Sequence, residues 1–543
     1  MSENGFTRER YSALALTRPI GQRIVIGLFG ALLFGLAGVS PLRAAERLEV
    51  QLEGMVIPVW IRELVDLGQP GGSSSSELIT WLNLLDADSR FDLFELLQAS
   101  LLTDQSMARQ MLRSWAGRQL LDAVSDLVRV DADSSGIVLF NTLELLLNSQ
   151  SEVTALDLLE ELPAQNVRLD LDALLQVASR WRRQLQQQQQ LVLALGRFPA
   201  TQVPVLPELA GKEVFAAGHE FTPLPVAHRT KPLQLEVWRP PAGTPLRSSW
   251  VVLMPGLGGS QDHFRWLALS LQRKGWPVVV LEHPGSDARA VHALLKGQRL
   301  APGAEVLPAR LADLQAVLRA REQGTLVLPG QRLVLMGHSL GALTALLAAG
   351  ITPEPGLYTR CRKALDDLPL TNLSRLLQCQ LVDVQMPKLQ SIPQLEAIVA
   401  LNSFGSLLWP RHGAVPLSVP VLLTGGTLDL ITPPLSEQLD LLLAISPHPA
   451  SRVVLVEGAS HFSPVRVEGQ MGEGRGDDLF QLGEELVGRQ PLAVQRLLAV
   501  EIQIFLEQVE AGEALEGSTH QQVGDLRLHR LDRNAAERLR KSQ

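Results

Sequence analysis

Residues 332–350 read RLVLMGHSLGALTALLAAG, and this stretch decides the fold of the larger part of the chain. It begins with a short apolar run, which is typical of a strand buried on both faces. It ends with the helical pattern ALTALLAAG. Between them, the residues Gly337, His338, Ser339, Leu340 and Gly341 place a serine midway between two glycines, so the backbone can turn sharply from strand to helix. The stretch therefore predicts a serine raised on a strand–helix turn.

Similar apolar runs recur on both sides of this turn. They lie at 250–254, 277–282, 397–402, 420–425 and 452–458, and helical patterns separate them. An alternating run, LQLEVW, precedes them at 233–238. Buried strands that alternate with helices predict parallel β-α-β units. We therefore expect an α/β domain with a mainly parallel sheet over residues 233–512.

Ser339 is the expected nucleophile, and a serine hydroxyl needs a base to take its proton. His461 follows the last apolar run, in the loop 459–462, where the carboxyl end of a strand would present it. His412 and His448 precede strands and would lie at the opposite edge of the sheet. His461 is thus the predicted base.

The third member of such a site orients the imidazole and stabilises its charged form. Asp429 follows the end of the preceding strand by three residues. Asp440 falls inside a helical run and Glu457 inside a strand, so neither is placed as well. The resulting chain order of serine, aspartate and histidine is that of an α/β-hydrolase.

An acyl-transfer site also needs donors for a negative oxygen. The amide of Leu340, directly after the nucleophile, is the first predicted donor, and the amide of Leu257 is the second. Leu257 lies in the loop PGLGGS after an early strand. The glycines of this loop are Gly256, Gly258 and Gly259. No Gly-Lys-Ser/Thr follows them, which argues against a phosphate-binding loop.

Residues 255–287 (PGLGGSQDHFRWLALSLQRKGWPVVVLEHPGSD), together with GHSLGA at 337–342, carry a family resemblance. They resemble the α/β-hydrolase branch that contains platelet-activating factor acetylhydrolases and dienelactone-hydrolase-like proteins. The resemblance covers about residues 230–510. It implies that the nucleophile, acid and base are Ser339, Asp429 and His461. This chain has Pro255 where relatives often have a histidine, and a serine where a dienelactone hydrolase proper has a cysteine.

The first 45 residues are expected to be a targeting segment. Residues 24–39 form an uncharged apolar run behind Arg18 and Arg23. SPLRAA follows at 40–45 and ends in two alanines, but Arg43 occupies a position where a cleavage site normally has a small residue. This is the layout of a secretory signal. Cleavage after Ala45 and retention as a membrane anchor both remain open. Either outcome predicts an exported protein, periplasmic or anchored facing the periplasm or lumen.

Residues 46–198 are expected to form a small all-helical domain. FDLFELLQASL (91–101) and LFNTLELLLN (139–148) carry the helical period. A signal, a helical domain of unknown function and a hydrolase domain together resemble a group of cyanobacterial predicted hydrolases. Residues 199–232 are expected to be a linker. Residues 513–543 are expected to be a polar tail, either solvated or in contact with an anionic membrane surface.

Residues 351–396, between the turn helix and the next strand, are expected to form a cap insertion. Its leucine-rich part, 365–384, could line an acyl-chain pocket or pack on the sheet. Both cysteines of the chain, Cys361 and Cys379, fall within it. In an exported protein this favours a disulfide, with two buried thiols as the alternative. A metal site has no support here, since the insertion contains no histidine.

The composition limits the function. The chain has 543 residues, a formal charge of −8, 46% hydrophobic residues and 20% charged residues. This is ordinary globular usage, and the acidity argues against nucleic acid as a partner. We expect a serine hydrolase that cleaves an acyl ester, such as a lipid or acetyl ester, without a cofactor. The alternative is a non-catalytic envelope protein that uses the same scaffold to bind a ligand.

Overall fold

The structure is a computed structural model, and its described residues fall into two compact units. One unit ends at Ala173, and the other begins at Leu174. The described residues are 46–52, 54–68, 79, 83, 100–102, 124–130, 136–149, 153–164, 166–201, 219–295, 298, 302–365, 372–387, 391–410, 417–466, 488–513 and 517–541. The predicted targeting segment 1–45 lies outside them.

The first unit is mixed rather than all-helical, which corrects the expectation for residues 46–198. It contains a four-stranded sheet in the order β2-β1-β6-β4. The strands are β1 (Arg47–Leu52), β2 (Met55–Trp60), β4 (Val128–Val130) and β6 (Asn166–Asp170). Its helices include α2 (Ile61–Gly68), α7 (Ile137–Ser149) and α8 (Ala155–Glu161). A second pairing joins β3 (Ser100–Leu102) to β5 (Val153–Thr154).

The helical prediction failed here because these strands are short and lie directly against helices. Strand β2 passes into α2 without a break, and β6 passes in the same way into α9 (Leu171–Leu195). Of the two runs with helical period, 139–148 is helical as part of α7. Most of 91–101 lies outside the described residues, and its end belongs to β3.

The second unit is built on a ten-stranded sheet in the order β15-β16-β14-β13-β12-β11-β9-β10-β8-β7. The strands are β7 (His219–Leu224), β8 (Leu233–Trp238), β9 (Ser249–Met254), β10 (Val278–Leu281), β11 (Arg332–His338), β12 (Leu395–Leu401), β13 (Val421–Gly426), β14 (Arg452–Val456), β15 (Thr519–Val523) and β16 (Leu526–Leu531). The six strands from β10 to β14 in this order are parallel to one another. All the strands predicted from the sequence are present.

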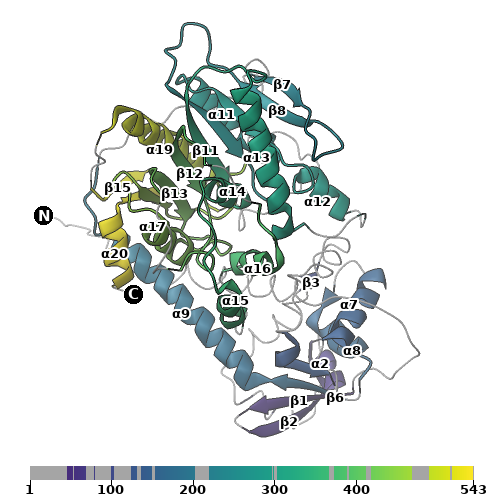
Figure 1. The fold of residues 1–543 in the computed structure, drawn as a ribbon. Helices are drawn as coiled ribbons and strands as arrows, with labels where there is room; N and C mark the ends of the chain where they lie inside the picture. The colour runs from purple at the N-terminus through teal and green to yellow at the C-terminus, as the bar shows by residue number, and fades with distance from the viewer. Residues whose placement is uncertain are drawn as a thin grey trace, which may run out of the picture. The chain divides into compact units, whose positions relative to one another are not determined.

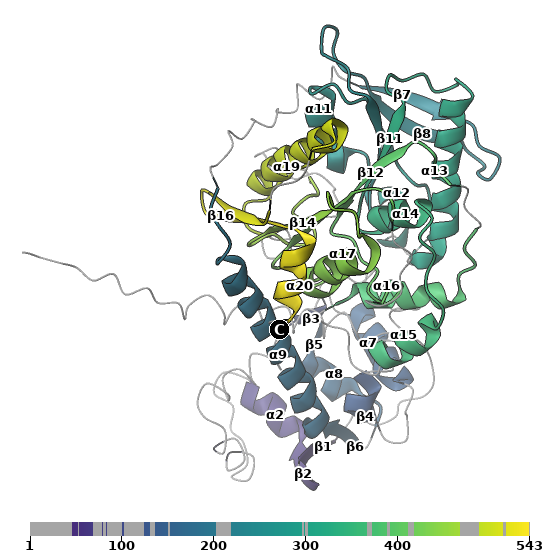
Figure 2. The ribbon, with the colours of Figure 1, turned by 60° about the vertical axis from the view of Figure 1, so that its left-hand side comes forward.

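Helices cover both faces of this sheet (Figures 1 and 2). One face packs against α11 (Arg265–Gln272) and α19 (Pro491–Ala511). The other packs against α13 (Leu307–Glu322), α14 (Leu340–Ala348), α17 (Asp440–Ile445) and α20 (Arg533–Lys541). Central strands are therefore buried on both faces, which is why they read as continuous apolar runs.

The C-terminal tail is part of this sheet, which corrects the expectation of a polar, solvated end at 513–543. Strand β16 pairs antiparallel with β14, and β15 extends the sheet beyond it. Leu526, Leu528 and Leu531 are buried, as is Leu539 of α20. The segment looks polar because its buried leucines alternate with arginines. The predicted linker 199–232 likewise contains an edge strand, β7.

The described part of the insertion at 351–396 contains three helices joined by irregular segments, and it ends at the start of β12. It contains α15 (Leu357–Leu365), α16 (Ser374–Gln380) and the short helix η3 (Leu381–Asp383). A disulfide joins Cys361 of α15 to Cys379 of α16, with their Cα atoms 5.4 Å apart. Leu377 and Leu381 pack on the hydrophobic core at the face of the sheet that α13 and α14 cover. For these two leucines packing on the core is the outcome, and Leu368 and Leu370 lie outside the described residues.

Candidate active site

Ser339 stands on a strained turn between β11 and α14. Its φ is 52° and its ψ is −117°, a conformation that side-chain-bearing residues rarely adopt. The amide of Ser339 donates to the carbonyl of Leu401 at 2.8 Å, which ties the turn to the neighbouring strand. Such strain costs on the order of 1–3 kcal/mol and persists where the surroundings enforce it.

The two glycines that flank the serine turn leave no room for a side chain. A Cβ on Gly341 would lie 2.0 Å from the carbonyl oxygen of Met254 and 2.7 Å from that of Pro255. A Cβ on Gly337 would lie 2.3 Å from the backbone of Gly341. The turn therefore packs its backbone directly against the end of β9.

We expect Gly341→Ala to destabilise the protein by about 3 kcal/mol or more, because backbone, which cannot rotate away, must move to admit the methyl group. The same movement displaces the serine turn, so the activity of the remaining folded protein should also fall. Chemical denaturation measures the stability change. Gly517→Ala is the matched control, since nothing lies within 4 Å of its Cβ. Equal stability of the two variants would contradict this packing.

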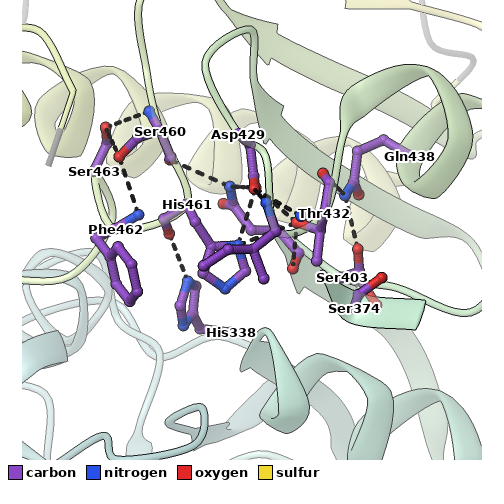
Figure 3. A network of polar contacts seen from close by, with 12 residues as sticks. His338, Ser374, Ser403, Asp429, Thr432, Gln438, Ser460, His461, Phe462 and Ser463 are labelled. Carbon is purple, nitrogen blue, oxygen red and sulfur yellow. Dashed lines mark hydrogen bonds and ion pairs between the residues drawn. The ribbon is translucent and has the colours of Figure 1, made fainter. Parts of the chain in front are cut away.

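Asp429 and His461 form a buried pair at the ends of neighbouring strands, β13 and β14. His461 Nδ1 donates to Asp429 Oδ2 at 3.0 Å (Figure 3). Asp429 Oδ2 also accepts from Asn402 at 2.8 Å and from the Thr432 hydroxyl at 2.6 Å. Its Oδ1 accepts from the amides of Ile431 and Thr432. The carboxylate thus receives five hydrogen bonds and cannot rotate.

These contacts keep the acid ionised. Burial favours the neutral form, but the nearby His461 and the hydrogen bonds from His461, Asn402 and Thr432 outweigh it and lower the pKa of Asp429 to about 2. A carboxylate that is charged at neutral pH holds the proton of the imidazole on Nδ1. Nε2 is then left with a free lone pair that can act as a base.

Asn402 and Thr432 were missed from the sequence. Asn402 directly follows β12 and has a positive φ of 46°, which asparagine tolerates better than most residues. Besides Asp429, its side chain reaches the carbonyl of Ser460 at 3.4 Å. The signal was a polar residue at the carboxyl end of a buried strand, between the strands of the serine and the acid.

His338, expected only as part of the serine turn, contacts the base directly. Its Nε2 donates to the backbone carbonyl of His461 at 2.9 Å, and the two rings lie 4.9 Å apart (Figure 3). Burial, reinforced by the nearby His461, lowers the pKa of His338 to about 3. His338 is therefore neutral near pH 7 and fixes the loop that carries the base.

The loop of the second predicted donor touches the serine turn. A Cβ on Gly256 would lie 3.1 Å from the carbonyl oxygen of His338 and 3.2 Å from Ser339 Cβ. The amides of Leu257 and Leu340 donate no hydrogen bond to any residue that the structure describes. The loop thus brings an unused backbone donor near the serine, beside the unused donor at the start of α14.

Ser339 and His461 are brought to the same edge of the sheet without a hydrogen bond between them in the described part of the chain. Such bonds are often long before substrate binds and tighten in the complex. No set of three His, Cys, Asp or Glu side chains among the described residues could hold a metal ion.

Comparisons with known proteins give a coarse relationship. A family model described as "Alpha/beta hydrolase of unknown function" (DUF1400) matches residues 44–170, less than a quarter of the chain. No curated protein matches. The chain is similar to a crystal structure of an α/β serine hydrolase without a lid from Xanthomonas campestris. The identity is 17%, the match covers 48% of this chain and 88% of that one, and the TM-score is 0.27.

The second unit has the α/β-hydrolase fold. In chain order, strands β7 to β14 form a sheet in which only β9 and β10 exchange places, and β8 runs antiparallel to its neighbours. The strained serine turn follows the central strand β11. The family model that matches the first unit is also described as an α/β hydrolase.

Proposed function

We propose that the protein is a serine hydrolase that cleaves an acyl ester through a covalent acyl-enzyme. The observation that carries this proposal is the Asp429–His461 pair at 3.0 Å, at the same sheet edge as the strained serine turn. The nucleophile is Ser339, the base is His461 and the acid is Asp429. A fold alone does not define an activity, so the proposal rests on this site.

The proposed reaction has two halves. His461 Nε2 takes the proton of Ser339 as Oγ attacks the ester carbonyl, and the amides of Leu257 and Leu340 stabilise the resulting oxyanion. His461 then gives its proton to the leaving alcohol, and an acyl-serine remains. Water repeats the sequence and releases the acid. Asp429 stays ionised throughout and stabilises the imidazolium.

A series of p-nitrophenyl esters from acetyl to palmitoyl tests the ester specificity. The proposal expects a rapid burst of nitrophenol equal to the enzyme concentration whenever deacylation is slower than acylation. Anilides and thioesters of the same acyl groups serve as controls. Turnover of anilides but not esters would reject ester hydrolysis. A preference for acetyl esters would support the platelet-activating factor acetylhydrolase branch, and a preference for long chains would support a lipase-like role.

We also propose that the protein is exported. The apolar run at 24–39 supports this, although it lies outside the described residues. The Cys361–Cys379 pair agrees with an oxidising compartment. Across the part of the chain that is described, no helix combines the length and apolarity needed to span a membrane.

The disulfide should matter more for the insertion than for the sheet. It closes a loop with a sequence separation of 18 residues, for which chain entropy predicts a contribution of roughly 3 kcal/mol. The amide of Ser374 donates to the carbonyl of Ile431 at 2.9 Å, so the insertion contacts the loop that carries Asp429. In the double variant Cys361→Ser, Cys379→Ser, we expect hydrolysis of long-chain esters to fall more than hydrolysis of acetyl esters.

Non-reducing peptide mapping of protein from its native compartment should first find the linked peptides. Two free thiols there would reject both the bridge and this argument for export. An equal loss of activity for short and long acyl chains in the double variant would reject the role of the insertion in selecting the acyl chain.

A further inference from the structure

Arg310 is a buried cation between the two turns of the site. It lies on α13 with 1% of its surface exposed. Its guanidinium donates to the carbonyl of Pro255, to the Ser286 hydroxyl at 2.8 Å and to the Thr344 hydroxyl at 3.2 Å. These three acceptors come from three different segments, and two of the segments carry the proposed oxyanion donors.

On the loop side, Arg310 fixes the peptides around Leu257. The Pro255 carbonyl belongs to the peptide that immediately precedes Gly256. Ser286 continues the contact, because its own carbonyl accepts from the amide of Gly258 at 2.8 Å. The loop is therefore held on both sides of the Gly256–Leu257 peptide, whose N–H is the proposed donor. Together with the amide of Gly259, which donates to the Gly256 carbonyl at 3.2 Å, these two anchors set the orientation of that N–H.

On the helix side, Arg310 contacts Thr344 of α14, one turn after Leu340. The Thr344 hydroxyl accepts from Arg310 Nε and donates to the carbonyl of Leu340 at 2.7 Å. Leu340 supplies the other proposed donor. A single guanidinium thus connects the two backbone segments that must keep a fixed separation for both amides to reach one oxygen.

The hydrogen-bond acceptors of Arg310 are all neutral. No carboxylate in the described part of the chain accepts a hydrogen bond from Arg310. The nearby Asp313 is occupied by His228, Arg229 and His283. Burial lowers the pKa of Arg310 to about 9, against the attraction of Asp313. Burying a cation on neutral acceptors is costly, so the hydrogen bonds to Pro255, Ser286 and Thr344 must offset that cost.

We propose that Arg310 is a positioning residue that holds the amides of Leu257 and Leu340 in register as an oxyanion hole. The proposal rests on the proposed hydrolase function. Arg310 touches no reacting atom. It acts through Pro255, Ser286 and Thr344, so its loss should weaken binding of the transition state more than binding of the substrate.

The test compares Arg310→Met with Arg452→Met. Arg452 is a second buried arginine, but it contacts Gln508 and the ring of Phe505 rather than the site. We expect Arg310→Met to lower kcat by about 10- to 100-fold, an effect no larger than removal of one oxyanion donor. The KM should change by no more than about threefold. Arg452→Met should change stability without changing kcat.

A second measurement separates positioning from general destabilisation. A trifluoromethyl ketone forms a tetrahedral adduct whose oxyanion occupies the hole, so Arg310→Met should weaken its inhibition by the same factor as kcat. If Arg310→Met does not fold, Ser286→Ala and Thr344→Val each remove one acceptor and should each lower kcat by about three- to tenfold. Arg310→Lys should restore only part of the activity, because an ammonium cannot reproduce the planar fork.

The outcomes distinguish the positioning role of Arg310 from the proposed hydrolase function. Suppose that the wild-type protein reacts with a fluorophosphonate at Ser339. If the folded Arg310 variants, or the acceptor variants, then keep full kcat and full affinity for the ketone, the positioning role of Arg310 is rejected. The proposed hydrolase function is not affected by that result. If Ser339→Ala keeps full activity, the hydrolase mechanism fails first. An equal loss of kcat in Arg452→Met at matched stability would also reject a specific role for Arg310.

Discussion

Ser339→Ala should lower esterase activity by at least about ten-thousandfold while leaving the fold intact. The hydroxyl forms the covalent bond in the proposed reaction, and members of such a site act as a unit. What remains should be the small acceleration that binding and the oxyanion donors provide. Alanine also relieves none of the backbone contacts of the turn, because the amide of residue 339 still reaches the carbonyl of Leu401. Activity against acetyl and longer esters is the measurement, with thermal unfolding as the check on folding.

Ser403 is the matched control for this substitution. It is also buried and lies just after a neighbouring strand, β12, but its hydroxyl has no place in the proposed reaction. Ser403→Ala should keep activity within a few-fold of the wild type. Full activity in Ser339→Ala would exclude the acyl-enzyme route through Ser339.

Asp429→Asn should lower kcat by about 1,000- to 10,000-fold. An asparagine amide placed where Oδ2 accepts from His461 would present a donor to that ring. The imidazole must then accept at Nδ1 and carry its proton on Nε2, where it cannot act as a base. The neighbouring donors of Asn402 and Thr432 would also face a donor, so a loss of stability should accompany the loss of rate.

Asp440→Asn is the control for charge alone. Asp440 of α17 forms an ion pair with Arg540 of α20 at 2.6 Å. This partly exposed pair should contribute about 1 kcal/mol or less to stability and nothing to catalysis. A kcat for Asp429→Asn within tenfold of the wild type would show that Asp429 does not orient the base.

The sequence was most informative where one physical signal dominated. Strands β9 to β14 are buried on both faces, so their apolar runs could not be confused with loops. The serine turn was predictable because it has room only for glycines. A Cβ on Gly341 would lie 2.0 Å from the carbonyl oxygen of Met254. The ends of parallel strands meet at one edge, which predicted that Asp429 and His461 would come together.

The predictions of secondary structure failed where a segment carried two different sequence patterns. In β16, Leu526, Leu528 and Leu531 carry the buried pattern, but the arginines between them gave the segment the composition of a polar tail. An antiparallel strand near a sheet edge needs only half of its residues to be apolar. In the first unit, β2 and β6 pass directly into helices, so no turn residues marked the change of period.

The supporting residues of the site were not predictable from spacing. Arg310 lies in a helix that precedes the strand of the serine, and nothing in the run 307–322 distinguishes it from Arg319 and Arg321 of the same helix. Only the folded position, with contacts to Pro255, Ser286 and Thr344, reveals its role. The same holds for Thr432, whose hydroxyl matters because it meets Asp429 and lies 3.1 Å from His461 Nδ1.

The most direct test of the central claim is to treat the full-length protein with a fluorophosphonate and map the modified peptide by mass spectrometry. We predict one stoichiometric adduct on Ser339. The adduct should be absent from Ser339→Ala, and labelling should be strongly slowed in Asp429→Asn. Absence of labelling in active, folded wild-type protein, or an adduct on another serine with Ser339 unmodified, would contradict the central claim.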